Sequence, residues 1–98
     1  MTVSLDRQGT KLTVTVEGKL DTQTSPTFDK TLQPELDGTT DLVIDLKGLN
    51  YISSAGLRVL LCAAQIMEQN GKMTIINANE EVLNVFALTG FDTLFTIA

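Results

Sequence analysis

Alternation of apolar and polar residues near the start of the chain predicts a β-hairpin. Val3 and Leu5 alternate with polar neighbours, and a second alternating run extends from Leu12 to Val16. The polar segment 7–10 between the two runs contains a glycine and predicts the turn. A period of two places alternate side chains on one face of a strand, so we expect two antiparallel strands with one buried face.

The next segment predicts a helix that begins near Ser25. Serine followed by proline is typical of a helix start, because serine caps the first N–H groups and proline fits the first helical position. Apolar residues spaced by four then form one helical stripe facing the sheet: Phe28, Leu32 and Leu36. Pro34 interrupts this stripe, so the helix should end or kink near Gln33.

The rest of the chain alternates apolar strands with helices. Residues 42–46 and 73–76 are almost wholly apolar, and the first of these runs is typical of a central strand covered on both faces. Helices are predicted from about Ser54 to Asn70 and from Glu80 to Gly90, followed by a short strand or tail. Their expected inner faces are Leu57, Leu60, Leu61, Ala64 and Met67 in the first helix, and Val82, Val85, Phe86 and Leu88 in the second.

The predicted element order is β-β-α-β-α-β-α-β. Alternation of strands and helices favours parallel neighbours joined by crossovers, with an antiparallel hairpin at the start. The fold class is therefore α/β, with a mixed, mostly parallel sheet of four to five strands. A chain of 98 residues, 43% of them hydrophobic, suits one small domain over residues 1–98.

Composition argues against several classes of function. The net charge is −5 and the seven cations are scattered, which argues against nucleic acid and favours a basic protein surface as partner. The chain has no histidine, which excludes a Ser-His-Asp triad and a histidine-ligated metal site. We expect no catalytic residue, metal or cofactor. Cys62 cannot form an internal disulfide and is expected to pack within a helix.

The N-terminal residues predict a cytoplasmic protein that does not associate with membranes. Residues 1–7 lack the basic start and long apolar run of a signal peptide. No apolar segment approaches the roughly 20 residues that cross a bilayer.

The segment after residues 42–46 carries the candidate chemistry. Two serines, Ser53 and Ser54, stand where the long helix is predicted to begin. Unpaired N–H groups and the positive end of the helix dipole make such a position favourable for a phosphate. The alternative is that one serine merely caps the helix. Gly56 is unusual in a first helical turn, and we interpret it as allowing another backbone, or a kinase, to approach the serine closely.

Residues 51–57, Tyr-Ile-Ser-Ser-Ala-Gly-Leu, resemble the phosphorylation signature of the STAS domain, the fold of bacterial anti-sigma-factor antagonists. The family pattern is an aromatic and an aliphatic residue, then Asp-Ser-Ser or Asp-Ser-Thr, then Gly-Leu. The phosphorylated serine follows the acidic position, which implies Ser54. Residues 18–21, 45–49 and 88–91 are similar to further family motifs, so the resemblance covers nearly the whole chain.

Two positions depart from this family pattern. Ser53 replaces the usual aspartate, and Ala55 replaces the second hydroxyl. The first change bears on kinase recognition or on the orientation of the serine. The second change removes a potential second phosphate acceptor.

The resemblance also implies roles for two charged residues. Asp21 is expected beside the serine loop, where it contacts a partner or holds the loop; the alternative is a simple turn residue. Arg58 stands one turn into the helix, where it pairs with a phosphate on Ser54, pairs with a partner carboxylate, or is merely solvated.

The function that the resemblance implies is a phosphorylation-controlled binding switch that is not an enzyme. The unmodified protein docks onto an anti-sigma factor of the serine-kinase type, which phosphorylates Ser54 and thereby releases itself, and a serine phosphatase restores the serine. The expected docking residues are Asp21, Ser53, Ala55, Gly56 and Arg58.

Two alternatives remain open. The first is a scaffold or sensor module of a larger signalling or transport-associated complex, without phosphorylation. The second is a small enzyme or a phospho-aspartate receiver. A receiver needs a late lysine, and no lysine follows Lys72.

Overall fold

The computed structural model describes residues 1–93 and 95–98, and it has the predicted order of elements. Strands and helices alternate after an initial hairpin, and a short 3₁₀ helix follows both α1 and α3. The elements are β1 Thr2–Gln8, β2 Lys11–Leu20, α1 Ser25–Leu32, η1 Gln33–Glu35, β3 Asp41–Ile52, α2 Ser54–Asn70, β4 Lys72–Ile76, α3 Glu80–Thr89, η2 Phe91–Thr93 and β5 Thr96–Ile97.

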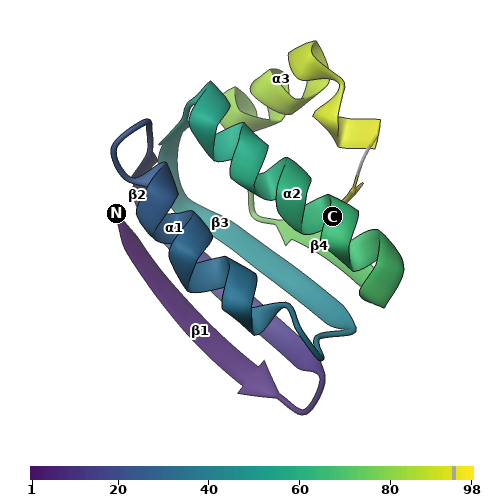
Figure 1. Cartoon of the computed structure of the whole chain (residues 1–98). Helices are drawn as coiled ribbons and strands as arrows, with labels where there is room; N and C mark the ends of the chain where they lie inside the picture. Colours follow the sequence, from purple (N-terminus) through teal and green to yellow (C-terminus); the bar gives the residue numbers. More distant parts are fainter. Residues whose placement is uncertain (94) are drawn as a thin grey trace.

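The five strands form one sheet in the order β1-β2-β3-β4-β5. Strands β1 and β2 pair antiparallel, and every other neighbouring pair is parallel, as predicted. Helices α1 and α2 lie across one face of this sheet (Figure 1). Because β2, β3 and β4 run in the same direction, the loops that follow β2 and β3 meet at one end of the sheet.

Strand β3 is central, as predicted, but only one of its faces is fully buried. Leu42, Ile44 and Leu46 have almost no exposed surface, whereas Val43 and Asp45 are partly exposed. The prediction of cover on both faces is therefore wrong. Val43 lies between Thr13 and Thr74 in the sheet register, and these neighbours supply its partial cover.

Helix α1 ends at Leu32, and Pro34 lies inside the 3₁₀ helix that follows. This confirms the predicted break near Gln33, because proline cannot donate the N–H that a continuing α-helix needs. Phe28, Leu32 and Leu36 are all buried, so the apolar stripe continues through the break.

Helix α2 has the predicted bounds, and most of its predicted inner face is buried. Leu57, Leu60, Ala64 and Met67 lie in the core, whereas Leu61 is only half-buried. In the described residues 1–93 and 95–98, no helix combines the length and the apolar character needed to cross a membrane.

Helix α3 buries Val82 and Phe86, and the Phe86 ring meets Phe95 edge-on at 5.3 Å between centroids. The prediction that Leu88 belongs to the inner face is wrong, because Leu88 is 87% exposed. Two helical positions separate it from Phe86, which turns it about 200° around the axis, away from the core. Gly90 ends the helix in the left-handed conformation.

Candidate functional site

Ser53 makes the turn from strand β3 into helix α2. Its backbone is extended, and its N–H donates to the Leu20 carbonyl at the end of β2 (2.8 Å). Its side-chain oxygen accepts from the Gly56 N–H at 3.4 Å, and its carbonyl accepts from the Leu57 N–H at 2.9 Å. Ser53 is therefore the cap of the helix.

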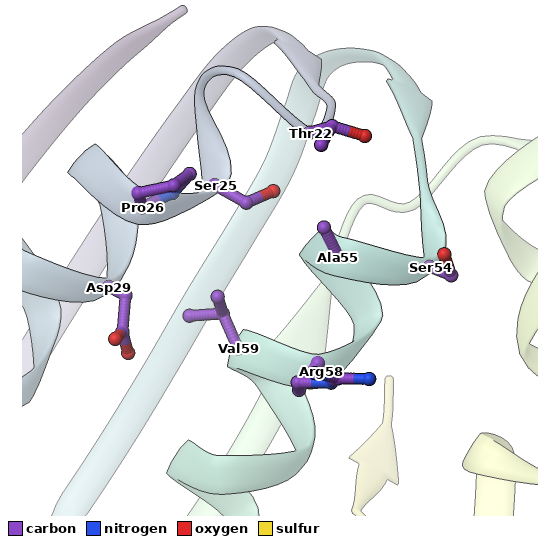
Figure 2. Close-up of a pocket in the computed structure, with 8 residues that line it drawn as sticks. All are labelled: Thr22, Ser25, Pro26, Asp29, Ser54, Ala55, Arg58 and Val59. Carbon is purple, nitrogen blue, oxygen red and sulfur yellow. The ribbon is translucent and has the colours of Figure 1, made fainter.

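Ser54 is the first residue of helix α2, and its side chain is exposed. Within the described part of the chain its hydroxyl makes no hydrogen bond. Figure 2 shows the hydroxyl projecting from the end of the helix. Because Ser53 provides the cap, the Ser54 hydroxyl has no role in holding the fold and is open to solvent.

Gly56 faces the interior and allows the helix to approach the sheet. A Cβ at this position would stand 2.8 Å from the Leu20 Cγ and 3.0 Å from the Ile52 Cγ1, both inside contact distance. The glycine is thus explained by close packing against the ends of β2 and β3. Our expectation of a glycine that a partner approaches was wrong, since the residue is buried.

Asp21 holds the loop that joins β2 to α1. Its Oδ1 accepts hydrogen bonds from the Thr24 N–H and the Gln23 N–H, each at 2.9 Å. The bond from the Thr24 amide, followed by smaller contributions that include the charge of Lys19, lowers the pKa of the Asp21 carboxyl below its ordinary value. Both donors lie two and three residues further along the same loop, so these bonds show the simple turn residue that was the alternative for Asp21.

A groove of about 480 Å³ lies between helices α1 and α2 (Figure 2). Three of the residues expected to be modified or to dock a partner line this groove: Ser54, Ala55 and Arg58. Ser53 and Asp21 hold the two adjoining loops and are not among the residues that line it. The lining residues are Thr22, Ser25, Pro26 and Asp29 from the loop and α1, and Ser54, Ala55, Arg58 and Val59 from α2.

Half of the residues that line the groove come from Thr22 and helix α1, where the sequence predicted a helix start and no part of the site. The signal for it was the parallel pairing of β2 and β3: once Leu20 stands beside Ile52, the loops after them must adjoin. Arg58 and Asp29 are the two charged residues of the lining. Asp29 accepts a hydrogen bond from the Gln33 side-chain amide at 3.0 Å, and the buried Ser25 hydroxyl donates to the Asp21 carbonyl.

Nothing in this arrangement resembles a metal centre. Among the residues that the structure describes, no group of three or more His, Cys, Asp or Glu side chains could hold an ion. Cys62 is half-buried on α2.

The chain matches one protein family over nearly its whole length. The sequence model of the STAS domain family matches residues 2–98, and the chain belongs to this family. BtrV of Bordetella bronchiseptica, provisionally named an anti-sigma factor antagonist, is 32% identical over 100 residues, covering all of this chain and 86% of the relative. The Anti-sigma-B factor antagonist of Staphylococcus aureus is 30% identical over 86 residues, covering 86% of this chain and 80% of the relative.

Solved structures show the same fold. An anti-sigma factor antagonist from Mycobacterium paratuberculosis superposes with a TM-score of 0.89 at 23% identity, covering 98% of this chain and 83% of the other. The Bacillus cell fate determinant SpoIIAA in its phosphorylated form superposes with a TM-score of 0.78 at 16% identity, covering 99% of this chain and 91% of the other.

The two serines should respond differently to substitution. Ser53→Ala removes the helix cap and should lower the free energy of unfolding by about 0.5–1 kcal/mol, the lower part of the range for caps because the bond is long. Ser54→Ala removes a hydroxyl that makes no hydrogen bond within the described residues, so it should change the free energy of unfolding by less than about 0.5 kcal/mol. Urea unfolding of both variants measures this difference, and an equal loss in both would contradict the assignment of the cap.

Gly56→Ala tests the close packing. At an open helical position this change would stabilise the protein by about 1 kcal/mol. Here the added methyl meets Leu20 and Ile52, so we expect a net loss of about 1–2 kcal/mol. Urea unfolding of Gly56→Ala gives the sign of the change in stability, and Ser54→Ala is the control from the same helical turn. A gain in stability for Gly56→Ala would refute the packing argument.

Asp21→Asn tests the loop through pH. The folded-state pKa of Asp21 lies below the ordinary value of 3.8, so the unfolded state binds more protons in the window beneath 3.8. The carboxylate therefore contributes stability above 3.8 that is lost as the pH falls through the folded-state pKa. The wild type should exceed Asp21→Asn in stability at pH 7, and the gap should narrow below pH 3.8. Urea unfolding between pH 7 and pH 3 measures it, and a gap independent of pH would argue against a charge-specific role.

Proposed function

We propose that this protein is an anti-sigma factor antagonist that binds its partner when Ser54 is unmodified and releases it when Ser54 is phosphorylated. The observation that carries the proposal is the exposed Ser54 hydroxyl at the first residue of α2, left free because Ser53 caps the helix. A side-chain hydroxyl that makes no hydrogen bond to the rest of the fold can be modified and restored without unfolding its surroundings.

The relatives support this reading of the site. Both curated relatives carry anti-sigma factor antagonist in their names, and SpoIIAA, which shares the fold, is described in a phosphorylated form. We extend these properties to the present chain because it shares this fold and because its signature segment stands at an exposed strand-to-helix turn.

The departure at Ser53 does not remove a structural function of the usual aspartate. Aspartate and serine are about equally favoured as helix caps, and the Ser53 side chain accepts from the Gly56 N–H. The replacement instead removes one negative charge next to the phosphorylation site. Ala55 lines the groove without a hydroxyl, and the Ser53 hydroxyl serves as the helix cap, so Ser54 is the proposed acceptor at this turn.

Phosphate on Ser54 suits the free protein and opposes the complex. The modification adds about −1.5 to −2 charges at pH 7. At a helix start this charge is favoured by about 0.3–1 kcal/mol. Within a docked interface it must lose water beside groups not arranged for it, which costs several kcal/mol. Each 1.4 kcal/mol or so is tenfold in affinity, so release follows.

The proposed partner is an anti-sigma factor of the serine-kinase type, with a separate serine phosphatase that restores Ser54. The groove between α1 and α2 offers an apolar floor of Ala55 and Val59 with the charged Arg58 and Asp29 beside it. The protein as a whole carries a net charge of −5, which favours a partner with a basic surface. In this role the protein is a binding module and performs no reaction.

The test uses a serine-kinase anti-sigma factor from the same genome, with ATP, and the wild type and three variants of this protein. Mass spectrometry should place phosphate on Ser54 in the wild type and in Ser53→Ala, and on neither serine in Ser54→Ala. Calorimetry should show that Ser54→Ala binds like the unmodified wild type. Ser54→Asp and the phosphorylated wild type should bind at least about tenfold more weakly.

Ser53→Ala is the matched control, because it loses the cap but keeps the acceptor. Equal binding by Ser54→Ala and by the phosphorylated wild type would defeat the switch. Binding without any phosphate transfer would instead favour a scaffold role in a larger complex.

A further inference from the structure

Arg58 is a free cation one helical turn beyond Ser54. Its side chain is exposed, and within the described residues it takes part in no ion pair; the one pair found there joins Arg7 to Glu35. Ser54 and Arg58 both line the groove, and both extend from the same side of α2 in Figure 2. The guanidinium is therefore available to a charge that appears beside it.

The order of the two residues along the helix favours such a pair. Residues four apart are neighbours on a helix surface, and long helical side chains lean back over the preceding turn. An anion at the earlier position with a cation four residues later is the better of the two orders. A planar guanidinium can also bind two phosphate oxygens at once, which an ammonium cannot.

The charges of the groove leave Arg58 as the lining residue that could attract a phosphate. The other charged residue of the groove is Asp29 on α1, which carries the same sign as a phosphate. Asp21 and Lys19 stand in the adjoining loop and at the end of β2, where their charges influence each other. Tyr51 of β3 and Glu81 of α3 line a second groove, which does not include Ser54 or Arg58. Among the residues that line the groove with Ser54, Asp29 is therefore the one carboxylate and Arg58 is the one cation.

We propose that Arg58 is the internal counter-charge of phosphorylated Ser54, a positioning residue that holds the phosphate against the first turn of α2. The proposal rests on Ser54 being the site of modification. In the unmodified protein the same guanidinium is exposed to a docking partner. Phosphorylation then both adds negative charge and withdraws the groove's positive charge from the partner.

The test does not need the kinase. Phosphoserine is installed at position 54 during translation in the wild type, Arg58→Gln, Arg58→Lys and Lys72→Gln. The second pKa of the phosphate is followed by phosphorus NMR. Arg58→Gln should raise this pKa by about 0.3 pH unit, about twofold in the ionisation constant, because the dianion loses its counter-charge. Arg58→Lys should restore part of the shift, and 1 M salt should reduce it.

Lys72→Gln is the control for a general loss of positive charge. Lys72 begins β4 and pairs in register with Asp41, at the opposite end of β3 from Ser53. An unchanged pKa in Arg58→Gln, or equal shifts in Arg58→Gln and Lys72→Gln, would overturn the proposal. Because the phosphate is supplied synthetically, failure of a kinase to modify Ser54 would count against the proposed function and leave this result standing.

Discussion

The close approach of helix α2 to the ends of strands β2 and β3 is the constraint on which the site depends. The Ser53 N–H donates to the Leu20 carbonyl across the strand ends, and Gly56 packs where no side chain would fit. Together these contacts fix the first turn of the helix against the sheet. They also bring the loop after β2, tied by Asp21, alongside the serine turn. Without this approach the groove between α1 and α2 would not be formed by these residues.

Two adjacent serines divide the work at this turn. The Ser53 side chain accepts a hydrogen bond from the Gly56 N–H at the start of the helix, a function that any good capping residue could perform. Ser54 looks outward and holds nothing in place. Because Ser53 caps the helix, the hydroxyl of Ser54 stays free at a helix start, where a serine usually serves as the cap. The cap made by Ser53 also explains why the family's aspartate can become serine while the fold is kept.

Much of the fold followed from local patterns in the sequence. Periodicity gave the hairpin and the long helix, and Pro34 marked the break after α1 because its effect on the backbone is local. The failures involve tertiary context. Leu88 is apolar but turned outward, and the far face of β3 is only partly covered, since no local pattern states which surfaces remain without a partner. Ser54 could be found because it lies in a short motif, and Arg58 directly follows that motif, whereas Thr22 and Asp29 join the site through strand pairing.

Gly56 shows how the same residue supports two opposite interpretations. From the sequence, a glycine beside two serines suggested an open surface for a partner. The structure gives it a packing role, and this strengthens the case for a switch that acts through charge. A helix start held by Leu20, Ile52 and a serine cap has little freedom to move. The Ser54 hydroxyl makes no hydrogen bond within the described residues, so a phosphate there would break no contact of the fold. Its main effect would therefore come from differential interactions with the partner. Rigidity at Ser53 and Gly56 would thus let the proposed modification at Ser54 act mainly on binding.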